Sequence, residues 1–250
     1  MEDVAVVDSH VGGLSQAERV VDTFVAPSKT FLDLFRSTAW WLPFILSIGC
    51  YLAFLTVAVH KVGQETMTQT MLHKMPAMEE KMASAPPDQQ AAMRKGFENQ
   101  TKPRYLLAPP IAIVFSLIVG GLFLVSANFF FGGTAKFWQM VAVYWYGMMP
   151  LVVHNLICMA ILGLGSSPES YDISNPLGTN PGFYMTPDHF SPFLIAIGSA
   201  LDLFTIWVIY LQILGVATVA KIKMSSATIA VLIWWVLWVL LKSLPSLLFA

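Results

Sequence analysis

Five apolar stretches, each long enough to cross a lipid bilayer, constrain this chain most. They lie at about residues 40–59, 106–131, 137–164, 193–220 and 228–248. A spanning helix needs ~20 mostly apolar residues. The composition agrees, because 56% of the 250 residues are hydrophobic and 12% are charged, about half the usual ~25% of soluble domains. The sequence therefore predicts an all-α, polytopic membrane protein with five transmembrane helices.

The chain before the first span divides into two parts. Residues 1–22 are polar and show no periodicity, which predicts a flexible cytoplasmic tail ahead of a membrane domain over residues 23–250. Residues 24–36 carry Phe31, Leu32 and Phe35 on one helical face and charged residues on the other. We expect an amphipathic helix in the membrane interface, with Phe31 and Phe35 facing lipid. The alternative is an ordinary helical lead-in to the first span.

A polar segment at residues 60–105 separates the first two spans and is expected to form two or three short helices outside the cytoplasm. It carries methionines at helical spacing, with His73 nearby: Met67, Met71, Met75, Met78 and Met82. Thioethers bind Cu(I), so a copper-collecting surface is one interpretation. The other is an apolar face that packs on a neighbouring helix, which we favour because Pro76 interrupts the stripe and no cysteine accompanies it.

Short loops predict the orientation. Lys221 and Lys223 lie in the turn between the last two spans, whereas residues 165–192 contain neither Lys nor Arg. The positive-inside rule then places the amino terminus in the cytoplasm and the carboxyl terminus outside. The segment at residues 60–105 opposes this assignment, because it would lie outside with seven basic residues.

Asp202 is the only charged residue inside the fourth apolar stretch. A carboxylate in hydrocarbon is costly, so Asp202 should face a partner, a cavity or water. The third span leaves the membrane where the fourth enters, which puts His154 at nearly the same depth as Asp202, with Asn155 beside it and Lys242 within reach. We expect an intramembrane polar cluster of His154, Asn155, Asp202 and Lys242. It serves either as hydrogen-bonded glue between helices, the interpretation that we favour, or as a proton or cation site.

Several function classes are not supported by the sequence. It contains no HExxH, P-loop or GxGxxG motif, so we expect no catalytic residues, no cofactor and no dedicated metal site. Glu79-Glu80 lies in the polar segment rather than in a span, unlike the paired glutamates of intramembrane proteases. The net charge of -1 argues against nucleic acid as a partner. The partners expected are the lipid bilayer and other membrane proteins, or a second copy of the chain.

The order of several short motifs resembles the bacterial members of the Yip1 domain family. The motifs are Phe24-Val25-Ala26-Pro27, Trp40-Trp41-Leu42-Pro43, Gly132-Gly133-Thr134-Ala135-Lys136, Pro150, Asn175-Pro176 and Leu201-Asp202-Leu203-Phe204. The resemblance implies five membrane helices, a cytoplasmic amino terminus, no catalytic activity and a place in the bacterial inner (plasma) membrane.

The resemblance also suggests a class of function. Eukaryotic relatives act in vesicle traffic and bind Rab-type GTPases through their cytoplasmic part. This chain lacks the Tyr-Gly-Pro motif of that part, which counts against a Rab-type GTPase as its partner. We therefore expect a non-catalytic integral membrane protein that organises membrane or partner proteins as a scaffold. The alternative is a small ion or metal permease that uses Asp202 and His154.

Overall fold

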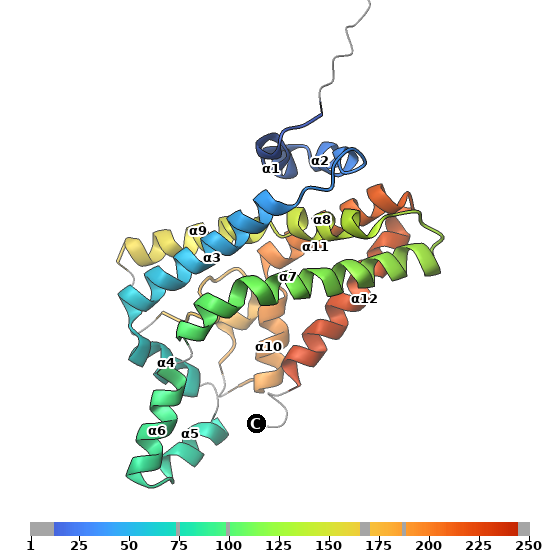
Figure 1. Ribbon diagram of the computed structural model, residues 1–250. Helices are drawn as coiled ribbons and strands as arrows, with labels where there is room; N and C mark the ends of the chain where they lie inside the picture. Colours follow the sequence, from blue (N-terminus) through green and yellow to red (C-terminus); the bar gives the residue numbers. More distant parts are fainter. Residues whose placement is uncertain (1–12, 74–75, 99–100, 166–170, 187–188, 245–250) are drawn as a thin grey trace, which may run out of the picture.

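A computed structural model describes residues 13–73, 76–98, 101–165, 171–186 and 189–244, and these residues are helical or loop (Figure 1). The helices, in chain order, are α1 (Gln16–Val25), α2 (Pro27–Asp33), α3 (Trp41–Val62), α4 (Gln64–His73), α5 (Pro76–Ala83), α6 (Pro87–Glu98), α7 (Thr101–Val125), α8 (Phe137–Gly147), α9 (Pro150–Gly163), α10 (Pro192–Ala200), α11 (Leu203–Ala220) and α12 (Met224–Ser243). A π-helical turn, η1 (Ser126–Phe130), extends α7, and a 3₁₀ turn, η3 (Pro181–Tyr184), precedes α10.

Five of these helical segments are long and apolar enough to cross a membrane, which confirms the all-α fold with five candidate spans. They are Trp41–Val62, Tyr105–Phe130, Phe137–Gly163, Leu203–Ala220 and Met224–Ser243. Pro150 stands where α8 gives way to α9, because proline lacks the N–H that a continuous helix would use. A proline in the middle of an apolar span is expected to interrupt the helix in this way.

The fourth span departs from the sequence prediction. We expected one helix over residues 193–220, but α10 ends at Ala200 and α11 begins at Leu203. Asp202 between them has an extended backbone, and its side chain accepts a hydrogen bond from the backbone N–H of Phe204. Aspartate stabilises a helix start far better than a helix interior. The residue that marked the span as unusual is therefore the one at which the helix breaks.

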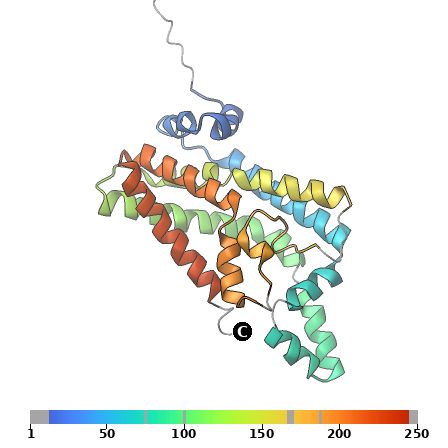
Figure 2. The ribbon, with the colours of Figure 1, turned by 180° about the vertical axis from the view of Figure 1, so that it is seen from behind.

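The amino-terminal region also differs from its prediction. The expected flexible tail reached residue 22, but α1 starts at Gln16 with a capping box formed by Ser15 and Glu18. The single interfacial helix expected over residues 24–36 is instead the pair α1 and α2, joined at Ala26. This pair lies across α8 and α11 on one side of the molecule (Figures 1 and 2).

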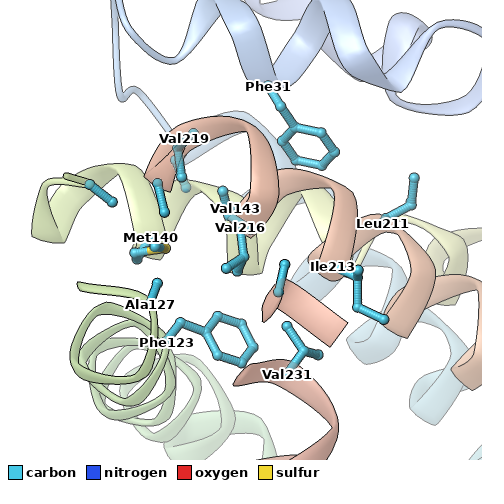
Figure 3. Close-up of a cluster of buried hydrophobic side chains, with 14 of the residues drawn as sticks. Phe31, Phe123, Ala127, Met140, Val143, Leu211, Ile213, Val216, Val219 and Val231 are labelled. Carbon is cyan, nitrogen blue, oxygen red and sulfur yellow. The ribbon is translucent and has the colours of Figure 1, made fainter. Parts of the chain in front are cut away.

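Phe31 corrects the interfacial interpretation. Its side chain is fully buried in the main apolar core, which α2 shares with α7, α8, α11 and α12. Figure 3 shows it reaching from α2 toward Val143 and Val216. Gly215 makes this approach possible, because a Cβ there would stand 2.8 Å from the Phe31 ring. The apolar face of α2 thus packs on protein, while Leu32 and Phe35 remain exposed.

Small residues bring α7 and α8 close together. Ser116 is fully buried, and a Cβ added at Gly120 would stand 2.8 Å from the side chain of Val141. The two helices are neighbours along their length. Residues with little or no side chain let helix backbones approach in this way.

The polar segment between the first two spans forms α4, α5 and α6, on the opposite side of the molecule from α1 and α2 (Figure 2). The methionines of the stripe are divided between α4 and α5, and Met75 lies outside the described residues. Met67 packs against the cluster of Phe54 and Ala58, and Met82 is buried. Met67 and Met82 thus contribute to apolar packing.

Candidate polar cavity

A cavity of about 350 Å³ opens beside the break between α10 and α11, and we call it the Asp202 cavity. Its walls come from α9, α10, α11 and α12 and from the loop before η3. Polar residues on the walls are His154, Ser174, Asn175, Asn180, Ser199, Asp202, Thr205, Lys242 and Ser243. Among the described residues, Asp202 is the one carboxylate on these walls.

Asp202 is 9% exposed and is held by neutral donors. One carboxylate oxygen, Oδ1, accepts from the backbone N–H of Phe204 at 2.8 Å. The other, Oδ2, accepts from the hydroxyl of Thr179 and from the amide of Asn180 at 3.3 Å. Hydrogen bonds to the ionised form offset the cost of burying a carboxylate.

The loop that supplies these donors is pinned by its own amides. Asn180 donates to the side-chain oxygen of Asn175 at 2.7 Å, and Asn175 donates back at 3.1 Å and to Ser199 at 3.3 Å. The backbone N–H of Leu203 donates to the carbonyl of Thr179 at 3.2 Å. These bonds fix the loop against the corner between α10 and α11.

The structure brings three of the four residues of the predicted cluster to one cavity. His154, Asp202 and Lys242 line it, and Asn155 does not. His154 instead lies within hydrogen-bonding distance of the Asn155 amide oxygen, at 3.4 Å, and meets the ring of Phe204 edge-on at 5.2 Å. In the described residues, Asp202 accepts hydrogen bonds from the loop and from the backbone N–H of Phe204, rather than from His154 and Asn155.

Asp202 lies nearer to the end of its span than expected, because the helix breaks at this residue. The sequence placed it about nine residues inside a span, but the candidate span begins at Leu203. With 18 residues, α11 is ~27 Å long at ~1.5 Å per residue, close to the ~30 Å hydrocarbon thickness. Lys242 lies in the last turn of the antiparallel neighbour α12. Asp202 and Lys242 thus lie at the same end of the two candidate spans.

Thr179, Asn180 and Ser199 were missed by the sequence interpretation. Asn180-Pro181 is typical of a turn, and this is the one signal for Asn180 in the sequence. A turn former is not identified as a hydrogen-bond donor to a residue more than twenty positions away. Only the folded corner brings these side chains to Asp202.

Five helical segments that are long and apolar enough to cross a membrane define the class, a polytopic integral membrane protein. The Yip1 domain model matches residues 21–243, so the chain belongs to the Yip1 domain family, as the order of its motifs suggested. Members of this family are generally non-catalytic membrane proteins. No curated protein and no solved structure matches the chain. The described residues also contain no group of three or more His, Cys, Asp or Glu side chains placed to share a metal ion.

Proposed function

We propose that this protein is a non-catalytic scaffold of the bacterial inner membrane, which binds another membrane protein or a second copy of itself. The amino terminus lies in the cytoplasm, and α4–α6 lie outside. One observation carries the proposal: a concave apolar groove of about 780 Å³ between α7 and α12. Its residues are Leu117, Ile118, Gly121, Leu122, Val125, Ser126, Phe130, Phe131, Ile229, Ala230, Ile233 and Trp234.

The shape and composition of this groove suit a transmembrane helix. Gly121 and Ala230 are small residues on its wall, and small residues let a second helix approach closely. The groove has no charged residue that would exclude an apolar partner. Ile118 and Ile233, on opposite walls, are each half exposed and offer dispersion contacts on both sides.

Site-specific photo-crosslinking in native membranes tests the proposal. A photo-reactive amino acid at Ile233 should give a discrete crosslinked band, because Ile233 faces the groove. The matched position is Ile45 on α3, which is equally exposed and lies outside the groove. A band at twice 27.6 kDa would identify a second copy, and another mass a different protein.

Filling the groove should abolish that band. Gly121→Leu places a side chain in the groove, and its Cβ would meet its nearest neighbour at an ordinary 3.8 Å. Gly49→Leu on α3 is the control, because open space surrounds that glycine. Equal crosslinking from Ile45 and Ile233, or a band that survives Gly121→Leu, would count against the scaffold.

A permease that uses Asp202 and His154 is the second candidate. It is favoured by the Asp202 cavity and by the interrupted helix beside it, since discontinuous helices commonly form ion sites in transporters. Against it stand the neutral donors already bound to Asp202. Flux measurements in proteoliposomes distinguish the two functions. A permease shows cation or proton flux that Asp202→Asn abolishes, whereas a scaffold shows none.

A further inference from the structure

We propose that the Asp202 cavity binds the headgroup of a zwitterionic aminophospholipid, with the ammonium at Asp202 and the phosphate at Lys242. This site goes beyond the scaffold function and does not depend on it. It belongs to the leaflet on the side of α4–α6, because the chain topology puts the start of α11 on that side.

The two charges of the cavity fit a ligand that carries both signs. Asp202 and Lys242 line the same cavity, but no ion pair joins them in the described part of the chain. An ionised carboxylate has ~four acceptor positions, and Asp202 uses three of them. An acceptor position therefore remains for an ammonium donor, and the exposed Lys242 is available for phosphate.

Aromatic side chains add a second feature that favours an ammonium. Trp235 and Trp238 on α12 both line the cavity. They are three residues apart, so they lie on one face of the helix. Indole faces attract cations, with tryptophan the best of the aromatic residues. A primary ammonium at Asp202 would have these indoles beside it and Thr205 as a further polar neighbour on the wall.

An apolar path leads from the polar cavity to the outside of the bundle. A groove of about 180 Å³ between α10 and α12 is lined by Ile197, Leu201, Trp235, Val236, Val239 and Leu240. Trp235 and Val239 line both this groove and the Asp202 cavity. An acyl chain bound along the groove would thus be continuous with a headgroup in the cavity.

The position and the volume of the Asp202 cavity also suit a lipid headgroup. The cavity lies where α11 starts and α12 ends, which is the expected level of headgroups, and tryptophans are enriched at that level. A volume of about 350 Å³ falls in the usual range of small-molecule sites. A glycerol headgroup lacks the ammonium that would donate to Asp202, and a choline headgroup has no N–H to donate.

Native mass spectrometry of the full-length protein tests the site. The protein is exchanged into detergent containing equal amounts of dioleoyl-phosphatidylethanolamine, dioleoyl-phosphatidylcholine and dioleoyl-phosphatidylglycerol. We expect the ethanolamine lipid to be retained about tenfold over the other two, because only its ammonium makes a charge-assisted hydrogen bond to Asp202. Equal retention of all three lipids would overturn the proposal.

Two variants test the contributions of the two charges one at a time. Asp202→Asn keeps the helix cap but should remove the preference for the ethanolamine lipid. Lys242→Gln should reduce retention of that lipid through loss of the phosphate contact. The controls are Asp88→Asn on α6 and Lys223→Gln at the far end of α12, neither of which lines the cavity. A preference that survives Asp202→Asn with unchanged strength would refute the role of the carboxylate.

A soluble headgroup distinguishes a lipid from a free phosphate compound. Phosphoethanolamine has both charges but no acyl chain, so it should displace the lipid only at much higher concentration. If it binds as tightly as the lipid, the groove between α10 and α12 contributes nothing, and the ligand is not a lipid. Leu201→Ser in that groove should weaken lipid retention and leave phosphoethanolamine binding unchanged.

Discussion

Two regions of the molecule bury a charged side chain, and they do so in opposite ways. In the α1–α2 pair, Arg19 is fully buried, and its Nε donates to the carboxylate of Asp33 at 2.6 Å while Nη1 donates to the carbonyl of Ser37 at 2.8 Å. At the corner between α10 and α11, Asp202 receives only neutral donors and faces a cavity. The guanidinium of Arg19 is paired with a carboxylate, whereas the hydrogen bonds of Asp202 come from uncharged groups.

This difference separates a closed structural site from an open one. The Arg19–Asp33 pair fastens α1 to α2, and the pair of helices then covers the core through Phe31. The Asp202 corner is just as well hydrogen-bonded but leaves space next to the carboxylate. A buried charge with its countercharge in place has no need of a ligand, whereas a carboxylate beside a polar cavity has room for one.

The largest effect is expected for the apolar contact that closes the amino-terminal region. Phe31→Ala should lower the free energy of unfolding by ~3–5 kcal/mol, because it empties a fully buried position between α2 and α11. Phe35→Ala is the matched control, since that residue is 46% exposed and the Lys221 ammonium lies over its ring. Thermal unfolding of the purified protein measures both. Equal losses would show that the two rings are not packed differently.

A smaller effect is expected for the ion pair. Arg19→Met should destabilise the protein by ~1–3 kcal/mol, because the Ser37 carbonyl loses its donor while Asp33 keeps Arg36. Arg36→Met is the control, since Arg36 is largely exposed and surface pairs contribute ~0–1 kcal/mol. Limited proteolysis between α2 and α3 reports the loosening. Unchanged cleavage in Arg19→Met would show that this ion pair does not hold α1 against α2.

The same ion pair predicts a pH dependence. Hydrogen bonds from Arg36 and then Arg19 hold the pKa of Asp33 below its ordinary value of 3.8. A carboxylate with a lowered pKa contributes its full stability above that ordinary value and loses it as the pH falls through the folded value. The packing of α1 and α2 should therefore persist down to about pH 4 and weaken below it. Loss of protease protection already at neutral pH would contradict this.

The smallest effect is expected at the open corner. Asp202→Leu removes the cap of α11 and should cost ~0.5–2 kcal/mol. The hydroxyl of Thr179 loses its acceptor, whereas the amide of Asn180 keeps Asn175 and the carbonyl of Leu177. Asp202→Asn should cost less, because an amide oxygen still accepts from the N–H of Phe204. Thermal unfolding compares the two variants directly. A loss as large for Asn as for Leu would mean that the charge itself, rather than the cap, stabilises the corner.

Specific parts of the candidate site could be predicted from the sequence. Asp202 was recognisable because a lone charge in an apolar stretch is costly, and Lys242 and His154 because antiparallel spans return to the same face. Asn155 was placed with them only by its neighbour in the chain, and its side chain lies outside the cavity. Depth along a span can be counted from the sequence, but the direction of each side chain around the helix depends on packing.

The class of fold follows from the amino-acid sequence alone, because the number and length of apolar stretches limit a chain in a bilayer to spanning helices. The sequence also determined the break at Pro150, where a backbone donor is missing. The tertiary structure decided whether an apolar face meets lipid or protein. The helical spacing of Phe31 in the sequence is the same in both cases. Its ring is buried because α11 packs against it, with Gly215 at the contact. The surroundings of Asp202 likewise depend on the tertiary fold, because Thr179 and Asn180 reach its carboxylate from a loop distant in sequence.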